Sequence, residues 1–443
     1  MSKNILLINP WIYDFTAYDF WLKPLGLLYI AAILQKYTKT RIHFIDCLSR
    51  HHPLLEKKTK SKPDGRGPFP KEEVEKPQVL KKVPRRYSRY GIPVTLFLQE
   101  LERVPLPDLV LLTGTMTYWY PGVQMAIELV RKKFGSVPVV LGGIYASLMG
   151  EHARRFSGAD EICQGPGENK ILPLVRKYLG DGAAEAAEFS TLDDLPHPAH
   201  GRLRSQEFLP LLTSRGCPFR CTFCASPILN EKFEQRKPSS VVAEITENFY
   251  LYKTRHLVFY DDALLLNREA HIVPILKGIL RERLPLSCHT PNGLHVREVN
   301  DEIACLFRQA GVRSLYLSQE SADAAVLRDS CPKVSPEDLE KALASLEKAG
   351  FRRPDINVYL IAGLPGQDPA GIRESICHVF RLGAKPRLAY YSPIPGTPLW
   401  SDLVAQGYFR PDADPLLHNK LTFPYLWGNF FSSDFESLRH FAE

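Results

Sequence analysis

The sequence predicts an α/β protein in which two parallel-sheet domains follow one another along the chain. Both halves alternate short apolar runs with segments of helical periodicity, which is the pattern of repeated β–α units. An alanine- and proline-rich stretch at residues 180–201 separates the halves and indicates a linker. A chain of 443 residues is also long enough for two or three domains.

The first half, residues 1–190, predicts a Rossmann-like, doubly wound parallel sheet. Helical segments separate the strand-like runs, and the helix expected at 122–134 ends in basic residues, which suits the negative end of a helix dipole. The expected strands are 4–9, 41–46, 109–113, 138–143 and 161–165. Ligands of such sheets bind beyond the carboxyl ends of the strands, so polar residues and glycines at those ends are candidate site residues.

Residues 51–90 interrupt this alternation with a basic, proline-rich insertion. The insertion contains twelve Lys or Arg and five Asp or Glu, a net +7 that equals the net charge of the whole chain. Few apolar residues predict a solvated surface excursion. The segment could instead wrap over a site or contact an acidic partner, and its Arg- and Tyr-containing end could pack on the body of the protein. Because the rest of the chain is near neutral, nucleic acid is not an expected partner.

The second half, residues 205–400, predicts a partial (β/α)6 barrel, in which functional residues lie at the carboxyl ends of the strands. Helical segments such as 239–252 and 336–349 lie between the strand-like runs. The expected strands are 209–213, 256–260, 286–290, 314–318, 356–361 and 388–391. Residues 401–443 form an aromatic-rich C-terminal extension, which we expect to cap the barrel.

Three cysteines stand in one short loop after the first of these strands. Cys217, Cys221 and Cys224 have the spacing CxxxCxxC in the stretch SRGCPFRCTFCAS. Three thiolates from one loop can hold three irons of a 4Fe–4S cluster and leave the fourth iron open to a cosubstrate. The alternatives are unrelated core cysteines or a structural zinc site. Structural zinc would need a fourth ligand, and the next histidine along the chain is His256.

The other cysteines of the nine are scattered and indicate buried thiols rather than disulfides. Cys288 and Cys331 could instead face a site in the second half. The N-terminus lacks the features of a secretion signal, and no apolar run reaches the ~18 residues that a membrane helix needs. We therefore expect a cytoplasmic protein without membrane insertion.

The cysteine loop resembles the cluster-binding loop of the radical S-adenosylmethionine (radical SAM) superfamily. Segments after the later strands resemble that family in order: FYDD, HTPNGLH, SQES, YLIAGLPGQ and YYSPIPGTPL. SQES has Ser318 and Gln319 where the family usually has Gly-Leu. The resemblance implies that S-adenosylmethionine (SAM) chelates the open iron and is cleaved reductively. It implies SAM contacts from Phe223, Asp261, Asp262, Glu320, Ser321 and Gly363.

The first half resembles the cobalamin-binding domain that precedes the barrel in many radical SAM enzymes. The matching segments are PLGLLYIAAIL, LLTGTMTYWYPGVQMAIELVR, VVLGGIYASLMGEH and QGPGE. The resemblance implies cobalamin contacts from Thr113, Gly114, Thr115, Thr117, Gly142, Gly143 and Gly165, where glycines allow close approach of a large, flat ligand. The chain lacks the DxHxxG motif that supplies an axial histidine in many cobalamin proteins. The alternative is a Rossmann-like domain that kept its shape and lost its cofactor.

The resemblance implies a cobalamin-dependent radical SAM enzyme that methylates or rearranges an unreactive carbon. Its expected partners are a small-molecule or metabolite substrate and an external low-potential electron donor. A second hypothesis is an RNA-modifying radical SAM methylthiotransferase, which only the basic insertion favours. Those enzymes bind a second cluster through three cysteines of the N-terminal domain, where this chain has Cys47 and Cys163. A third is a non-catalytic cobalamin or iron–sulfur sensor, which would need a response domain, and none is visible in the sequence.

Overall fold

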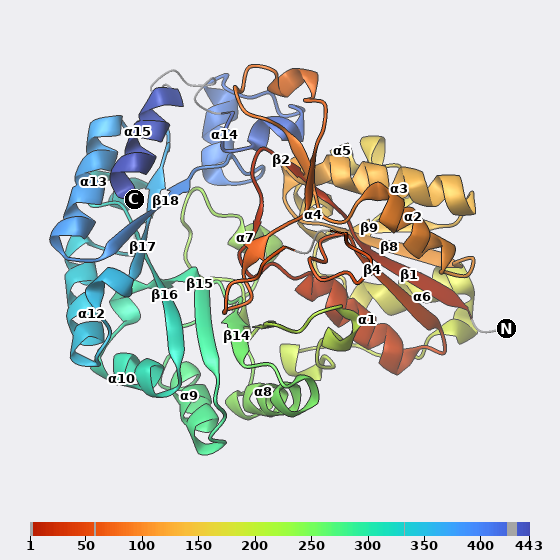
Figure 1. Cartoon of the computed structure of the whole chain (residues 1–443), viewed down its shortest axis with the longest axis horizontal. Helices are drawn as coiled ribbons and strands as arrows, with labels where there is room; N and C mark the ends of the chain where they lie inside the picture. Colours follow the sequence, from red (N-terminus) through yellow and green to blue (C-terminus); the bar gives the residue numbers. More distant parts are fainter. Residues whose placement is uncertain (1–2, 57–58, 332, 423–431) are drawn as a thin grey trace. The chain divides into compact units, whose positions relative to one another are not determined.

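The computed structural model describes residues 3–56, 59–331, 333–422 and 432–443 (Figure 1). The chain forms two compact units. The first comprises Met1–Phe208 with Asp414–Leu417, and the second comprises Leu209–Ala413 with His418–Glu443. Among the described residues, no helix has both the length and the apolar character to cross a membrane.

The first unit is built on a five-stranded parallel sheet in the order β10–β9–β8–β1–β4. Its strands are β1 (Asn4–Asn9), β4 (Arg41–Asp46), β8 (Leu109–Gly114), β9 (Val139–Gly142) and β10 (Glu161–Ile162). The chain adds β4 on one side of β1 and then β8, β9 and β10 on the other. The strand order therefore reverses between β1 and β8, and such a reversal is where doubly wound sheets bind ligands.

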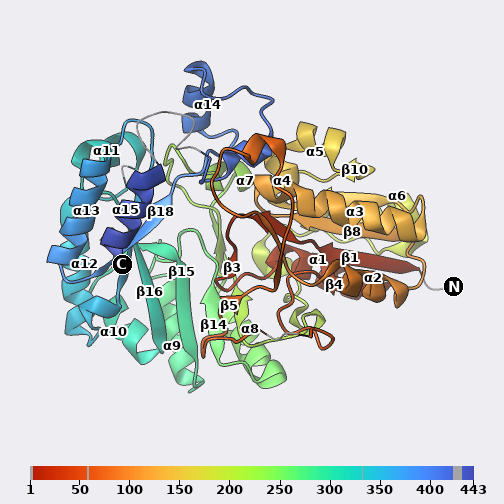
Figure 2. The same ribbon diagram turned by 45° about the horizontal axis from the view of Figure 1, so that its top comes forward.

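Helices cover both faces of this sheet, as the continuous apolar character of β1 requires. The helices are α1 (Leu25–Tyr37), α2 (Val94–Glu102), α3 (Tyr120–Phe134), α4 (Gly143–Leu148), α5 (Gly150–Phe156) and α6 (Glu168–Leu179), and Figure 2 shows α3 running alongside β8. Leu6 and Ile8 of β1 pack with Phe97 of α2 and Ile127 of α3. The sequence-based expectation of a doubly wound sheet is confirmed, although α2, α4 and α5 had not been expected.

The insertion at residues 51–90 is exposed over much of its length, as its composition predicted, but part of it packs against the rest of its unit. It supplies β5 (Gly67–Pro68), β6 (Lys71–Glu73) and β7 (Ser88–Tyr90), which build two small antiparallel sheets with β2 (Ile12–Asp14) and β3 (Tyr18–Asp19). The hydroxyls of the buried Tyr87 and Tyr90 donate to the carbonyls of Tyr13 and Phe15 at 3.2 and 3.1 Å. The Arg- and Tyr-containing end therefore packs on the body of its own unit.

The second unit contains a six-stranded parallel sheet whose strands follow sequence order. The strands are β11 (Leu209–Leu211), β14 (His256–Phe259), β15 (Ser287–His295), β16 (Val312–Glu320), β17 (Asn357–Ala362) and β18 (Lys385–Tyr390). The helices α8 (Pro238–Tyr252), α9 (Ile272–Arg281), α10 (Asp301–Gln309), α12 (Pro336–Lys348) and α13 (Pro369–Arg381) lie along one side of the curved sheet (Figure 1). This arrangement confirms the predicted partial barrel.

Helix α15 (Ser432–Ala442), near the C-terminus, packs on α13 and β18, with Leu438 and Ala442 in the barrel core. The remaining helices of this unit are α7 (Ser226–Leu229), α11 (Ala324–Ser330) and α14 (Pro398–Ala405). Most of the aromatic residues that mark the C-terminal extension lie outside the described residues: Phe423, Tyr425, Trp427, Phe430 and Phe431.

Alternate residues of the barrel strands separate into two chemically different faces. Leu315, Leu317 and Val358 pack in the core beneath the helices. On the other face Tyr316 and Tyr359 stack with ring centroids 5.2 Å apart. The face away from the helices is therefore aromatic and polar, as the inner side of a barrel that handles a substrate would be.

Candidate cluster loop and cofactor contacts

The three-cysteine loop is the closed end of a small hairpin. Strands β12 (Ser214–Arg215) and β13 (Glu234–Gln235) pair in antiparallel fashion and clamp the two ends of the loop. Gly216 enters the loop with a φ of +82°, and a Cβ there would lie 2.6 Å from the carbonyl oxygen of Lys232. Only glycine fits this close crossing without a shift of the backbone. The loop leaves the carboxyl end of the first barrel strand, as the sequence predicted.

Asp261 fastens the start of this loop. Its Oδ1 accepts hydrogen bonds from the Thr213 backbone N–H at 3.1 Å, from Thr213 Oγ1 at 2.6 Å and from Ser214 Oγ at 2.7 Å. Burial raises the pKa of this carboxyl to about 6. Its Oδ2 is buried and has no hydrogen-bond partner among the described residues. The sequence assigned Asp261 to SAM; in the structure its bonded oxygen positions the cluster loop.

The three thiols of the loop influence one another electrostatically. Burial raises the pKa of Cys217, and raises that of Cys224 to about 11, and in both cases the Cys221 charge adds to the rise. Contact with the Cys331 thiol instead lowers the pKa of Cys221 to about 7. No three His, Cys, Asp or Glu side chains of the described residues converge as one metal ion would require. Cluster thiolates bind separate irons, and Cys217 and Cys224 both lie close enough to Cys221 for its charge to shift their pKa values.

A fourth cysteine lies against the loop. The Sγ atoms of Cys221 and Cys331 are 3.5 Å apart, although 110 positions separate them in sequence. Cys288, the other cysteine that could have faced a site, lies in the barrel core, with its Sγ 3.8 Å from the Ala310 carbonyl. Of the two cysteines that sequence analysis left open, only Cys331 approaches the candidate site.

Glu320 and Lys333 form a shielded ion pair in the same region. The Lys333 Nζ lies 3.7 Å from Glu320 Oε1, and each side chain is 12% exposed. Burial raises the pKa of Glu320. Burial also disfavours the charged form of Lys333, but the neighbouring negative groups, Glu320 first, outweigh this effect and raise the pKa of Lys333. Glu320 has a φ of +66° at a bulge that ends β16, a strained conformation typical of functional positions. Sequence analysis missed Lys333, because no motif marks it.

The remaining SAM candidates divide into two groups. Asp262 is exposed and accepts a hydrogen bond from Ser226 Oγ at 2.6 Å, and Phe223 packs partly buried against the barrel core. Ser321 accepts from the Asp323 N–H at 3.0 Å, and the N–H of Gly363 donates to Gln367 Oε1 at 2.9 Å. The polar groups of Ser321 and Gly363 are therefore engaged in turns of the protein itself.

The cobalamin candidates gather at the carboxyl edge of the first unit's sheet. Gly114 at the end of β8 forms a bridge to Gly143 after β9. The Ser147 hydroxyl links the next loop, because it accepts from the Gly165 N–H at 2.8 Å and donates to the Gly143 carbonyl at 2.9 Å. The structure thus brings together the loops that hold the candidates Thr113, Gly114, Thr115, Thr117, Gly142, Gly143 and Gly165.

The shape of this edge has an internal cause at Gly143. Its φ is +89°, and a Cβ would lie 2.5 Å from the Gly114 carbonyl oxygen. The turn itself therefore demands glycine. Beside these loops, Met116 and Ile144 are 45% and 38% exposed, which leaves apolar surface at the edge where a ligand of a doubly wound sheet would lie.

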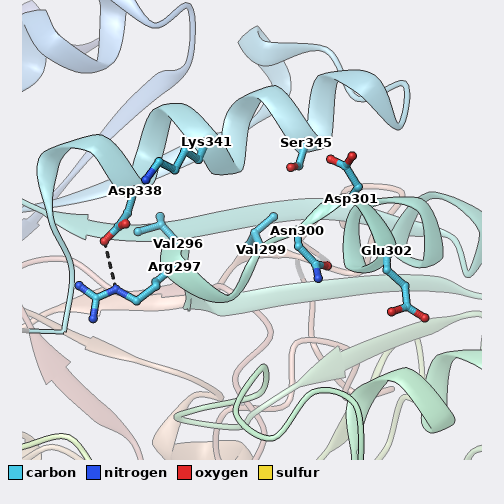
Figure 3. A pocket seen from close by; sticks show the side chains of 9 residues that line it. All are labelled: Val296, Arg297, Val299, Asn300, Asp301, Glu302, Asp338, Lys341 and Ser345. Carbon is cyan, nitrogen blue, oxygen red and sulfur yellow. Dashed lines mark hydrogen bonds and ion pairs between the residues drawn. The ribbon is translucent and has the colours of Figure 1, made fainter.

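Two surface cavities lie elsewhere. One of about 410 Å³ is bordered by α10 and α12, and Arg297 Nε donates to Asp338 Oδ2 at 3.2 Å on its rim (Figure 3). The other, of about 530 Å³, lies beside β10 and α6. None of the candidate cluster, SAM or cobalamin residues lines either cavity.

The sequence model of the radical SAM superfamily matches residues 211–376. An uncharacterized methyltransferase of Pyrococcus horikoshii is 24% identical over 332 residues, which cover 68% of this chain and 70% of the relative. The anaerobic magnesium-protoporphyrin IX monomethyl ester cyclase of Cereibacter sphaeroides is 25% identical, covering 67% of this chain but about half (53%) of the cyclase. A tRNA-2-methylthio-N(6)-dimethylallyladenosine synthase of Yersinia enterocolitica is 25% identical, covering 61% of this chain and 59% of the synthase.

Two solved structures share the fold over nearly the whole chain. The radical SAM methyltransferase TsrM of Kitasatospora setae aligns with a TM-score of 0.67 at 17% identity, covering 97% of this chain and 83% of TsrM. The cobalamin-dependent SAM radical enzyme OxsB aligns with a TM-score of 0.65 at 14% identity, covering 99% of this chain and 66% of OxsB. At this identity the likeness establishes the fold, and it extends over both units.

Proposed function

From the match of residues 211–376 to the radical SAM superfamily, we propose that the chain is a cobalamin-dependent radical SAM enzyme that cleaves SAM reductively to act on an unreactive carbon. The observation that carries the proposal is the clamped hairpin loop with Cys217, Cys221 and Cys224 at the carboxyl end of β11. When bound there, a reduced 4Fe–4S cluster supplies the electron for SAM cleavage. Methylation is the transfer that we favour, because the relatives include a methyltransferase.

The chain's own residues prepare the cluster end of the barrel. Asp261 fixes Thr213 and Ser214, and with them the first residues of the loop. Lys333 places a positive charge among Glu320, Cys221 and Cys217. That charge stabilises anionic groups at this site, whether iron-bound thiolates or the carboxylate of SAM.

Asp262 and Glu320 are the side chains that we assign to the cationic parts of SAM. Asp262 is exposed beside the loop, and its Oδ2 is held by Ser226 of α7. A carboxylate oriented in this way can accept hydrogen bonds from an ammonium group. Phe223 offers its partly exposed ring to the adenine, and we retain Ser321 and Gly363 as residues that shape the nearby turns.

The first unit would hold cobalamin at the carboxyl edge of its sheet. The exposed side chains of Met116 and Ile144 and the polar groups of Thr113, Thr115 and Thr117 suit a large ligand with an apolar face and amide arms. TsrM, which has the same fold, is described with cobalamin and a [4Fe-4S] cluster bound. Cobalamin, when bound, supplies a methyl carrier.

We infer a small-molecule substrate that contacts the inner face of the barrel. TsrM is described with tryptophan as its substrate. Here the stacked Tyr316 and Tyr359 lie on that face, and Arg387 Nε donates to Asn357 Oδ1 at 2.8 Å beside them. This surface can hold a substrate with both aromatic and polar groups. An external low-potential electron donor and a cytoplasmic location complete the proposal.

The direct test is formation of 5′-deoxyadenosine from SAM. Protein prepared without oxygen, reconstituted with iron, sulfide and hydroxocobalamin, is given SAM and dithionite, and the product is measured by liquid chromatography. We expect product from the wild type and at least a hundredfold less from Cys217→Ala, since one missing thiolate removes a cluster ligand. Cys288→Ala, a buried thiol in the barrel core, is the matched control and should retain product formation.

The absorption spectrum of bound corrinoid tests separately whether the protein binds cobalamin. If the reconstituted protein cleaves SAM but retains no corrinoid after gel filtration, the proposal of a cobalamin cofactor is refuted and the proposal of SAM cleavage is not.

The rival assignment as a tRNA methylthiotransferase is supported by the similarity to the Yersinia enterocolitica synthase. It predicts a second cluster, for which the first 208 residues offer only Cys47 and Cys163. An iron content well above about four per chain would favour that rival.

A further inference from the structure

Cys331 occupies a position that the cluster assignment does not explain. Its side chain is fully buried, and its Sγ lies 3.5 Å from the Sγ of Cys221. The three-cysteine motif already accounts for the iron ligands that the superfamily uses, so a fourth thiol is not needed as a ligand. A sulfur–sulfur distance of this size is a hydrogen-bond contact between the two side chains.

The contact is fixed by the backbone on both sides. Cys331 ends α11, where its N–H donates to the Leu327 carbonyl at 2.8 Å. The residue before it, Ser330, accepts at its carbonyl from the Thr222 N–H at 3.0 Å, and Thr222 directly follows Cys221. Each cysteine is therefore adjacent in sequence to one partner of the same backbone hydrogen bond. This anchoring holds the backbones of the two cysteines close together, so that their thiols can meet.

The direction of the hydrogen bond follows from the chemistry of an iron ligand. A cysteine bound to iron is a thiolate and has no proton to donate. With a cluster in place, the proton between the two sulfurs must therefore belong to Cys331. Hydrogen bonds to cluster sulfurs favour the more negative, reduced state and so raise the reduction potential.

We propose that Cys331 is a positioning residue for the cluster: its buried thiol donates a hydrogen bond to the sulfur of Cys221 and raises the reduction potential. This inference rests on the proposed function, because it presupposes a cluster on Cys221. It assigns Cys331 no iron and no contact with substrate. Its effect is on the fraction of cluster that a given electron donor can reduce.

The test is a redox titration of the reconstituted full-length protein, monitored by the electron paramagnetic resonance signal of the reduced cluster. At a fixed solution potential near the wild-type midpoint, Cys331→Ala should show about fivefold less reduced relative to oxidised cluster, the equilibrium effect of one hydrogen bond. Cys331→Ser, which keeps a donor, should lie closer to the wild type. Cys288→Ala, which removes a core thiol that lies against the Ala310 carbonyl, should titrate like the wild type.

Iron content separates the possible outcomes. Cys331→Ala should keep the same iron content as the wild type; loss of iron from both Cys331→Ala and Cys331→Ser, with normal circular dichroism, would make Cys331 a ligand and overturn the inference. Equal midpoints for the wild type and Cys331→Ala would overturn it as well. Iron-free wild-type protein would refute the proposed function itself, whereas a normal cluster with an unchanged midpoint would refute only the role of Cys331.

Discussion

The loops at the carboxyl edges of the two parallel sheets are held in place by different interactions. At the barrel edge, side chains fix the site: Asp261 binds Thr213 and Ser214, and Lys333 pairs with Glu320. At the edge of the first unit's sheet, the tight Gly114–Gly143 backbone bridge leaves little room for side chains, and the Ser147 hydroxyl joins the next loop to it. The exposed side chains there include the apolar Met116 and Ile144.

The difference matches the ligands that we assign. A charged cluster and a zwitterionic cosubstrate need buried charges and hydrogen bonds in defined positions. A large ligand held mainly over its surface needs shape and apolar contact instead. Substitutions should therefore act through lost hydrogen bonds and charge at the barrel edge, and through backbone shape and ligand affinity at the other.

The largest effect on stability is expected at Asp261. Replacing it with alanine leaves the buried donors of Thr213 and Ser214 without their acceptor. We expect Asp261→Ala to lower the free energy of unfolding by about 4 kcal/mol. Urea unfolding followed by circular dichroism measures this loss. Asp262→Ala, at the exposed neighbouring position, is the control, and an equal loss in both variants would show that Asp261 has no special role.

The next effect is at the other edge and depends on backbone shape alone. Gly143→Ala adds a methyl group 2.5 Å from the Gly114 carbonyl at a φ of +89°. The expected cost is about 3 kcal/mol, because strain and overlap add. Gly135→Ala, also at positive φ but with no atom within 4 Å, isolates the backbone term and should cost about 1 kcal/mol. Equal costs for the two variants would mean that the Gly114–Gly143 crossing is not tight.

The pH dependence of the free energy of unfolding tests the raised pKa of the buried Asp261 carboxyl. Because the pKa of Asp261 is raised to about 6, the folded protein retains this proton to a higher pH than the unfolded chain does. The stabilisation is therefore complete below about pH 4 and lost as the pH rises through 6, a change of about 3 kcal/mol. Asp261→Asn should lack this decline. Parallel profiles for the wild type and Asp261→Asn between pH 4 and 7 would contradict the assignment.

The smallest effect is expected for the apolar surface of the first unit. Ile144→Asp places a charge on an exposed side chain and should leave the free energy of unfolding within about 0.5 kcal/mol of the wild type. It should weaken hydroxocobalamin binding about tenfold, as measured by equilibrium dialysis. Ile228→Asp, at an exposed isoleucine in α7, provides the control. An unchanged affinity of Ile144→Asp for hydroxocobalamin would show that the ligand does not bind at this edge.

Periodicity predicted the sheets well because buried strands are marked by continuous apolar runs. The expected strands 4–9 and 41–46 coincide with β1 and β4. Helix α2, by contrast, follows the insertion and was missed, and the tyrosines that pack the insertion cannot be told from exposed ones by composition. The sequence pattern within one strand or helix indicates which of its residues are buried. Whether an irregular segment is buried depends instead on contacts with residues far away in the sequence.

Sequence could propose a site only where the residues are neighbours in the chain. The spacing of Cys217, Cys221 and Cys224 marks a candidate cluster loop, which stays a prediction. Cys331 and Lys333 reach the loop only through the fold, from positions after β16, so their roles depend on long-range contacts. Ser321 and Gly363 illustrate the converse, because motif-like segments can also be turns whose polar groups bond to the protein.

The most direct test of the central claim is the iron and acid-labile sulfide content of protein prepared and reconstituted without oxygen. The account predicts about four of each per chain for the wild type. It predicts almost none for a variant in which Cys217, Cys221 and Cys224 are all replaced by alanine, with Cys288→Ala matching the wild type. An iron-free wild type, or a triple variant that retains its iron, would contradict it.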